Sequence, residues 1–376
     1  MQKKIIALAI AAAISAPAFA DTSNVTVYGK ADLSYDSIKT GTATNGTAGT
    51  TSNRVSSNTT LIGLKGSEDL GDGLSAIWQV ESLILVGNTA GVAATTTAAS
   101  NAQIGNRNTF LGLSSASAGT VVMGRHDTPY KISTRAYDVF GDGIADSRAL
   151  TGGGVAAAAS FDGRQDQVVA YISPKLGGVA TLAVGYVNLA PLDNVATQAK
   201  NSAVSVAGMF DIGSGFGAAL AYEAHDFGAA GVTAATKEKA TKIGASYTMD
   251  AINVNFAYEK TSDNLTALTA ANKNGHSDYY LSGKYSLTAN DAIKLAYTKA
   301  NTINGLTGTD AKQVTIGYDH VLSKRTSVYA LYTKLSNGTA ASYVLGSGTS
   351  SVGGATTIAG AGASPSALAF GMKHTF

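Results

Sequence analysis

The chain of 376 residues contains no cysteine, only 5 prolines and a single tryptophan, Trp78. Without cysteine it has no disulfide, no thiolate nucleophile and no cysteine-ligated metal. Charged residues are also scarce, at 14% of the chain, whereas about 25% is usual in a soluble domain. Beyond the first 20 residues there is no apolar run long enough for a transmembrane helix, so none is predicted.

Residues 1–20 have the pattern of a secretory signal peptide. Lys3 and Lys4 are followed by an apolar stretch over residues 5–14, and the segment ends in Ala-Phe-Ala, a small-x-small cleavage site. We expect cleavage there and one mature domain over residues 21–376. The mature chain has 25 basic residues, since the signal carries two of the 27, and all 25 acidic ones. This balance gives no support to nucleic-acid binding, which normally needs a basic face.

Strict alternation of apolar and polar residues recurs from one end of the chain to the other. The clearest examples are residues 25–35, 242–249 and 252–260. Runs of this length predict strands with one apolar and one wet face. The 43 glycines and few prolines suit many strands joined by tight turns. The stretch over residues 366–376, SALAFGMKHTF, alternates in the same way and ends on Phe376.

The connections between alternating runs are of two kinds. Seven are short and rich in Gly, Asn, Asp and Ser, as tight hairpins require. They are residues 69–74, 115–119, 175–178, 212–215, 248–251, 288–291 and 322–326. Eight longer polar segments separate and flank the hairpins. They are residues 36–57, 87–105, 127–165, 189–201, 228–237, 261–275, 303–310 and 337–365.

Seven hairpins and the two terminal strands add up to 16 strands. An even strand number, with short turns at one end and long loops at the other, predicts a 16-stranded antiparallel transmembrane β-barrel. The last strand would pair with the first, and Phe376 would join the aromatic residues at a membrane interface. A soluble β-sandwich would also alternate, but it would not need a long loop at every second connection. No repeat of the length of a propeller blade is present.

The third long loop, residues 127–165, carries aromatic and aliphatic side chains that need somewhere to pack. We therefore expect it to fold into the barrel and narrow the channel. Asp138, Asp142 and Asp146 stand in its middle at four-residue spacing. The alternative is an exposed loop with ordinary solvated charges.

Arginine is concentrated around this loop, because six of the seven lie between Arg54 and Arg164. Arg107, Arg125 and Arg164 flank the strands next to the loop, which predicts a basic wall opposite an acidic loop. Such an arrangement biases the ions and polar solutes that pass. For a single arginine, a loop salt bridge or a snorkelling position is the alternative.

Enzymatic motifs are weak. The five histidines are scattered, and no paired metal ligands, P-loop or dinucleotide fingerprint occurs. His276 and Asp278 flank Ser277 in one alternating run, where neighbours point to opposite faces, which is poor geometry for a catalytic triad. We therefore expect no enzymatic activity, no cofactor and no metal.

Several segments resemble the general trimeric porins of Gram-negative outer membranes, in their beta-proteobacterial branch. They are residues 25–32 (VTVYGKAD), 61–82, 108–125, 171–178 and the final GMKHTF. The resemblance implies a 16-stranded barrel in the outer membrane, a homotrimer and a third loop folded inward. It also implies that outer-membrane lipid surrounds the barrel and that the insertion machinery recognises Phe376.

The resemblance also assigns site residues. The basic pore-lining positions of that family correspond to Lys65, Arg107, Arg125, Arg148 and Arg164 in this chain. Its constriction-loop tip corresponds to residues 137–143, with Asp138, Asp142 and the nearby Asp146 as acidic partners. Leu61 departs from the pattern, because the family commonly has arginine there, and this weakens the expectation of anion selectivity.

The sequence thus predicts an outer-membrane channel for passive diffusion of ions and small hydrophilic solutes. Three alternatives remain open: a substrate-specific channel, a mainly adhesive surface protein, and a barrel enzyme such as a lipase. A specific channel would show saturable block by its solute. A lipase would need Ser and His together near the rim, and the sequence does not supply such a pair.

Overall fold

The computed structural model describes residues 24–84, 104–153, 160–189, 201–227, 236–263, 275–346 and 356–376. The predicted signal peptide, residues 1–20, lies outside the described residues. So do large parts of the predicted loops at residues 87–105, 189–201, 228–237 and 261–275. Within the described part of the chain, no helix is long and apolar enough to cross a membrane.

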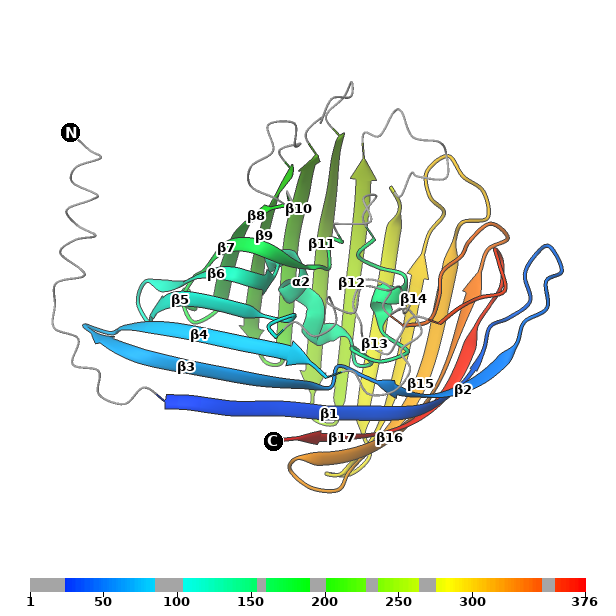
Figure 1. Ribbon diagram of the computed structural model, residues 1–376, viewed down its shortest axis with the longest axis horizontal. Helices are drawn as coiled ribbons and strands as arrows, with labels where there is room; N and C mark the ends of the chain where they lie inside the picture. The colour runs from blue at the N-terminus through cyan, green and yellow to red at the C-terminus, as the bar shows by residue number, and fades with distance from the viewer. Residues whose placement is uncertain are drawn as a thin grey trace.

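The strands form one antiparallel sheet in which β1 pairs with β2, β3 and β17, and every strand from β3 to β16 pairs with the next (Figure 1). The bounds are β1 Asn24–Lys39, β2 Thr51–Ser57, β3 Leu61–Gly71, β4 Leu74–Leu83, β5 Thr109–Ser115, β6 Gly119–Asp127, β7 Arg164–Ile172, β8 Ala180–Asn188, β9 Asn201–Gly213, β10 Phe216–Phe227, β11 Thr236–Met249, β12 Ile252–Asp263, β13 Ser277–Ser286, β14 Asp291–Ala300, β15 Ala311–Val321, β16 Thr326–Asn337 and β17 Ser366–Thr375.

Two of these segments, β2 and β3, make up a single barrel strand. Both pair antiparallel with β1, β2 along residues 33–39 and β3 along residues 24–30. Between them the chain leaves the ladder at Thr59, which has a positive φ of 59°. The Thr60 hydroxyl bridges this break, because it accepts from the Asp32 amide at 3.0 Å and donates to the Asp32 carbonyl at 3.1 Å. The predicted closed barrel of 16 strands is confirmed.

The connections alternate as predicted, with seven short turns at one end of the barrel and eight longer connections at the other. In barrels of this kind the longer connections lie outside the cell, and we call that end the loop end. The first loop is shorter than predicted, because β1 continues to Lys39 and β2 begins at Thr51. This polar hairpin does not show the alternation of apolar and polar residues that marks a membrane-spanning strand.

Closure joins the two ends of the described chain. β1 and β17 pair from Lys30 opposite Thr375 to Lys39 opposite Ser366. The pairing extends one residue further, since Gly29 and Phe376 exchange backbone hydrogen bonds of 3.0 and 3.1 Å. The Phe376 ring covers the Cα of Gly29, where a Cβ would lie 2.3 Å from it.

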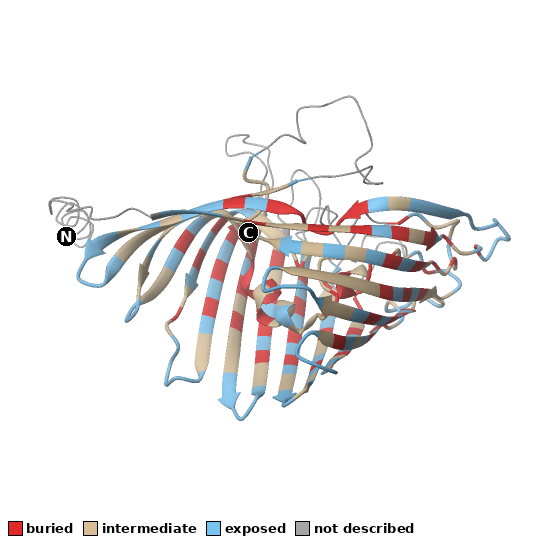
Figure 2. Cartoon of the chain, turned by 90° about the horizontal axis from the view of Figure 1, so that it is seen from below, coloured by how far each residue is buried: buried red, intermediate tan, exposed pale blue. Residues whose placement is uncertain are grey.

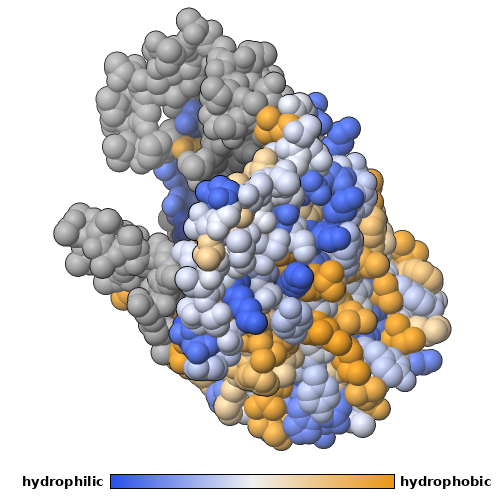
Figure 3. Space-filling model, turned by 90° about the vertical axis from the view of Figure 1, so that its right-hand side faces the viewer, coloured by the Kyte–Doolittle hydropathy of each residue, from blue (hydrophilic) through white to orange (hydrophobic). Residues whose placement is uncertain are grey.

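Large apolar side chains point outward and small or polar ones inward. On β15 and β14, Ile316 and Leu295 are 51% and 54% exposed, whereas the neighbouring Thr315 and Ala296 are buried. Figure 2 shows the resulting alternation of buried and exposed bands along the strands. Figure 3 shows apolar side chains gathered over part of the outer surface, next to a more hydrophilic region. The barrel therefore has the apolar exterior that a bilayer requires.

Candidate functional site

The segment between β6 and β7 folds into the barrel, as predicted for the third loop, and we call residues 128–163 loop 3. It contains helix α2 (Pro129–Thr134) and the 3-10 turns η1 (Arg135–Tyr137) and η2 (Ser147–Ala149). Pro129 starts α2, and the Thr128 side chain caps it by accepting from the Lys131 amide at 3.3 Å. Figure 1 shows α2 lying against the inner side of the sheet, where it contacts β8 to β11.

Loop 3 is seated on the wall at positions where the wall has no side chain. The three contacts are Pro129 on Gly185, Tyr137 on Gly244 and Phe140 on Gly317. A Cβ at Gly244 would lie 2.5 Å from the Tyr137 ring, and one at Gly317 would lie 2.6 Å from the Phe140 ring. Real Cβ atoms do not approach other atoms so closely, so the glycines permit the docking.

The middle of loop 3 supplies an apolar core inside the barrel. Phe140, Ile144 and Leu150 are buried against inward-facing residues such as Leu331 and Leu335 of β16. Backbone and polar contacts extend the docking, since the Tyr280 hydroxyl of β13 donates to Asp138 at 2.7 Å. The aromatic and aliphatic residues of the loop thus pack as the sequence predicts.

The three aspartates in the middle of loop 3, Asp138, Asp142 and Asp146, are paired within the loop. Arg135 Nη2 lies 2.7 Å from Asp142 Oδ1 and 2.9 Å from Asp146 Oδ2. Arg148 Nη2 lies 2.7 Å from Asp146 Oδ2 and 3.3 Å from Asp142 Oδ1. The Asp138 and Asp146 side chains are 4% and 0% exposed, whereas that of Asp142 is 33% exposed. Only Asp142 among the three presents an appreciable carboxylate surface.

The arginines hold two of these carboxylates ionised. Burial is the largest single influence on Asp142 and would raise its pKa, but the charges of Arg135, Arg148 and Lys30 together outweigh it and lower that pKa to about 2. Burial is likewise outweighed at Asp146, whose pKa Arg135 and Arg148 hold well below its usual range. Burial and the neighbouring Asp146 instead raise the pKa of Asp138.

The wall on the side of β3 to β5 carries a second group of charges. Lys65 is exposed on the inward-facing side of β3, with its Nζ 5.3 Å from the centre of the Tyr28 ring. The Tyr28 hydroxyl donates to Glu81 Oε2 at 3.0 Å, and Arg107 forms an ion pair with Glu81. The Arg107 side chain is 13% exposed, so Glu81 both fixes it and offsets part of its charge.

Arg164 belongs to a third group, at the base of loop 3. Its Nη2 lies 3.1 Å from Asp127 Oδ1, and its Nε donates to the Asn108 side chain at 2.6 Å. Lys131 Nζ lies 2.8 Å from the same carboxylate oxygen. Burial lowers the pKa of Lys131 to about 8 against the opposing effect of Asp127.

Arg125 stands apart from these groups. Val121 and Met123, at alternate positions before it on β6, face outward, so alternation places Arg125 on the same outer face. The β6–β7 register is irregular at this point. Its Nη1 lies 2.7 Å from Asp166, whose side chain is 69% exposed. Of the five basic residues assigned from sequence, the structure therefore brings Arg107, Lys65 and Arg164 to the inner wall regions and Arg148 into loop 3.

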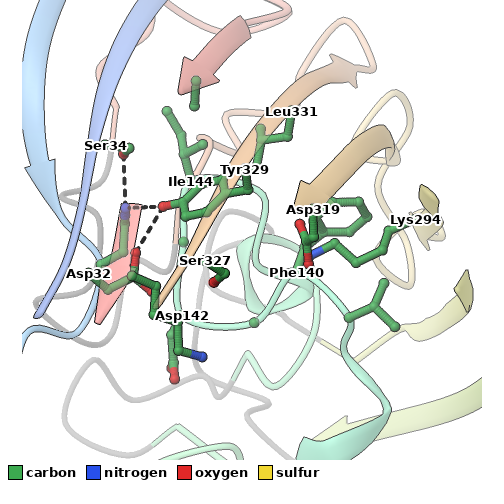
Figure 4. Close-up of a pocket in the computed structure, with 16 residues that line it drawn as sticks. Asp32, Ser34, Phe140, Asp142, Ile144, Lys294, Asp319, Ser327, Tyr329 and Leu331 are labelled. Carbon is green, nitrogen blue, oxygen red and sulfur yellow. Dashed lines mark hydrogen bonds and ion pairs between the residues drawn. The ribbon is translucent and has the colours of Figure 1, made fainter. Parts of the chain in front are cut away.

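Sequence reasoning missed the charges around the tip of loop 3. A cavity of about 160 Å³ lies between the tip and the facing wall (Figure 4). Its charged lining residues are Asp142 of the tip and Asp32, Lys294, Asp319 and Lys373 of the wall. Lys294 Nζ lies 2.8 Å from Asp319 Oδ2 and 4.9 Å from the centre of the Phe140 ring. The alternation of residues 25–35 already placed Asp32 on the wet face of its strand, which is the signal that could have found it.

Lys30 of β1 lies beside this cavity, between the loop tip and the wall. Its Nζ lies 3.8 Å from Asp142 Oδ2 and 3.9 Å from Asp32 Oδ2, so it spans the gap between the loop tip and the wall. The Tyr329 hydroxyl donates to Asp32 Oδ1 at 2.9 Å, as Figure 4 shows. Inside a closed barrel with an apolar exterior, an inward loop and facing charges leave a polar, narrowed path.

Comparison with known proteins identifies the family. A family model described as Gram-negative porin matches residues 7–340. The chain belongs to the Gram-negative porins. This porin is similar to the major outer membrane protein P.IB of Neisseria lactamica, at 28% identity over 87% of the chain and 91% of the relative. It is also similar to outer membrane porin protein 32 of Delftia acidovorans, at 26% identity over the whole of both chains.

Solved structures show the same fold. An anion-selective porin from Comamonas acidovorans superposes with a TM-score of 0.70 at 23% identity, over 94% of this chain and all of the other. OmpF of Salmonella typhi gives a TM-score of 0.65 at 18% identity, over 94% and 98%. The porin is thus an outer-membrane protein that forms a water-filled channel for passive diffusion of ions and small hydrophilic solutes.

Proposed function

We propose that the porin's selectivity filter is the gap between the tip of loop 3 and the wall formed by β1 and β3 to β5. The docking of loop 3 on the opposite wall, through Pro129, Tyr137 and Phe140, is the observation that supports this most directly. Loop 3 occupies the side of the barrel from β8 to β16, so solutes pass along the other side.

Basic side chains dominate the proposed path. Lys65, Arg107 and Arg164 lie on or beside its wall, and Lys30 faces the loop tip. Their effect is moderated by the carboxylates that pair with them and by the exposed part of Asp142. Arg148 holds the loop in shape and contributes to the filter only through Asp142 and Asp146. We therefore propose a weak preference for anions, with size as the main criterion of passage.

Removing Arg107 and Arg164 tests the charge assignment. In Arg107→Ala plus Arg164→Ala, Glu81 and Asp127 lose their arginine partners and the path gains two net negative charges. We expect the reversal potential in a potassium chloride gradient across a planar bilayer to shift toward cation selectivity. Lys175→Ala, in the turn between β7 and β8, removes a lysine far from the path and serves as the control. An unchanged reversal potential in the double variant would refute the charge assignment.

We also propose that the porin assembles as a homotrimer. A Vibrio cholerae outer membrane protein with the same fold, TM-score 0.64, is described as a trimer form. The family resemblance of the sequence supports the same stoichiometry here.

A further inference from the structure

Asn58 has a buried side-chain oxygen that is left without a hydrogen-bond donor. The residue lies where the chain leaves the ladder between β2 and β3, next to Thr59 with its positive φ of 59°. Asn58 is 2% exposed, and its Oδ1 has no hydrogen-bond partner among the residues that the structure describes. A buried acceptor without a donor is costly, and backbone strain of this kind is concentrated at functional sites.

The neighbouring hydrogen bonds determine which end of the Asn58 amide is unpaired. Its Nδ2 donates to the Ser34 hydroxyl and to the Tyr329 hydroxyl, both at 2.8 Å. These hydroxyls donate elsewhere, Ser34 to Asp36 at 2.7 Å and Tyr329 to Asp32 at 2.9 Å. Each can therefore only accept from Asn58, so a rotated amide would lose both bonds. Figure 4 shows the bonds at Ser34, Tyr329 and Asp32.

The unpaired oxygen faces the tip of loop 3 across the cavity of about 160 Å³. At Gly143 of the tip, a Cβ would meet only the Phe140 carbonyl oxygen at 3.8 Å and Asn58 Oδ1 at 4.0 Å. The absent side chain of Gly143 thus leaves a space bordered by two acceptors. The carboxylates of Asp32 and Asp142 line the same cavity. Such surroundings suit an ammonium group, which has three donors and no acceptor.

Lys373 supplies positive charge to the same cavity. It lines the cavity from β17 and lies directly opposite Asp32 in the β1–β17 ladder. Asp32 is already 3.9 Å from Lys30 Nζ, and within the described part of the chain no ion pair involves Lys373. The other lysine of the lining, Lys294, is paired with Asp319 at 2.8 Å. Lys373 is therefore the group that an incoming carboxylate would meet.

The charges around the cavity balance one another. Its lining has three carboxylates and two lysines, and Lys30 beside it adds a third positive charge. A lone anion or cation would add an uncompensated charge to this partly enclosed site, whereas a molecule with one charge of each sign would not. The cavity has the volume of engineered protein cavities that hold benzene, so it accommodates roughly six heavy atoms.

We propose that this cavity binds a small zwitterion, an amino acid of roughly six heavy atoms. The ammonium group of the ligand donates to Asn58 Oδ1 and to the Phe140 carbonyl beside Gly143, and its carboxylate pairs with Lys373. Equilibrium binding at this site is independent of which ions pass the proposed selectivity filter.

Saturation-transfer NMR of the refolded porin in detergent measures this binding, with β-alanine as the probe. β-Alanine matches the cavity in size, whereas propionate lacks its ammonium group and n-propylamine lacks its carboxylate. We expect β-alanine to bind saturably and each of the other two to bind at least about tenfold more weakly, because each loses one set of charged hydrogen bonds.

Blocking the ammonium position is a test that changes no charge. Gly143→Val fills the space beside Asn58 Oδ1, and its Cβ makes only ordinary contacts, so loop 3 should stay docked while β-alanine binding is lost. Gly283→Val on β13 adds the same side chain away from the cavity and should bind β-alanine like the parent. Channel conductance reports that each variant has folded.

Two further variants assign the two ends of the ligand. Asn58→Leu removes the acceptor and should lower the affinity for β-alanine to that of propionate. Lys373→Gln removes the positive charge and should lower it to that of n-propylamine. Lys324→Gln, in the turn between β15 and β16, is the control and should bind β-alanine like the parent. Absence of saturable β-alanine binding, equal affinity for the three compounds, or parental affinity in Asn58→Leu or Lys373→Gln would each overturn the proposal.

Discussion

Arg148 shows how a residue can govern the channel without lining it. Its side chain is 4% exposed and pairs with Asp146, which is fully buried. Together with Arg135 it neutralises the carboxylates that the sequence suggested as a negative surface. Removing one member of a buried pair leaves the other charge uncompensated, which is far more costly than losing an exposed pair.

We expect Arg148→Gln to loosen loop 3 while leaving the barrel intact. Breaking a buried ion pair costs about 3 kcal/mol, and Arg135 remains as a partner, so opening of the loop should become at least roughly tenfold more frequent. Amide hydrogen exchange of residues 138–151 measures this opening. Arg148→Lys keeps the positive charge but lacks the paired donors of the guanidinium group. Its exchange rate should therefore lie between those of the parent and the Gln variant. Unchanged exchange in Arg148→Gln would show that Arg135 suffices.

Acid should release loop 3 through Asp142. Its pKa is about 2 in the folded loop and 3.8 ordinarily, so the unfolded loop takes up a proton first as the pH falls. The stabilisation is therefore complete above about pH 4 and is lost as the pH falls toward about 2. Pepsin, which is active in this range, should cut loop 3 faster at the lower pH. Asp142→Asn should reduce the difference in cleavage rate between the two pH values. If the parent is cleaved equally fast at both pH values, after correction for the activity of pepsin, the assignment is contradicted.

At the scale of elements, loop 3 and the wall are matched by shape. Pro129, Tyr137 and Phe140 each lie over a wall glycine, and three different strands supply those glycines. The contacts span β8 to β15, so the loop is held at several places along its length. The position of the loop therefore depends on the absence of side chains in the wall as much as on the residues of the loop.

Gly317→Val should displace the tip of loop 3 and raise single-channel conductance. The new Cβ would lie 2.6 Å from the Phe140 ring, too close for the ring to stay in place. Adding Phe140→Ala should relieve the clash and restore loop docking in part. Gly283→Val on β13 controls for adding a branched side chain to a strand, because Gly283 shares the outward parity of Leu281 and Tyr285 and the nearest atom to its Cβ is 3.6 Å away. Equal conductance of the Gly317 and Gly283 variants would show that Phe140 does not set the position of the tip.

The sequence predicted the elements better than it predicted their contacts. Alternation and turn residues revealed the strand number, and the apolar side chains of residues 127–165 indicated that the third loop folds inward, because these patterns are local. The first hairpin was partly missed, since residues 36–39 and 51–57 pair as strands without an apolar face. The pairing of Arg135 and Arg148 with Asp142 and Asp146 could not be predicted, because it depends on how loop 3 folds back on itself.

At the scale of the whole molecule, closure brings Phe376 to Gly29. The last residue contributes two backbone hydrogen bonds and a ring that remains 49% exposed on the outer face. An exposed aromatic at the end of a membrane strand stabilises the barrel at the bilayer interface. The family resemblance predicts a second role for Phe376, as a signal for the insertion machinery.

Deleting Phe376 separates these roles. Two hydrogen bonds of about 1 kcal/mol each and part of a ring contact are lost, so the refolded barrel should survive in detergent with a lower thermal midpoint. In cells, a recognition signal predicts that assembly into the outer membrane fails. Phe376→Ala keeps the backbone bonds and tests the ring alone. If the deletion variant assembles normally in cells, Phe376 is not an assembly signal and acts only as an anchor at the bilayer interface.

The wall glycines also determine how the channel behaves electrically over time. A loop tethered at one point would swing through the pore and make the current flicker. Loop 3 is instead seated at Gly185, Gly244 and Gly317, so no single thermal fluctuation frees it. The open pore should therefore carry a steady current with little excess noise, because the glycines give the constriction the rigidity of the barrel itself.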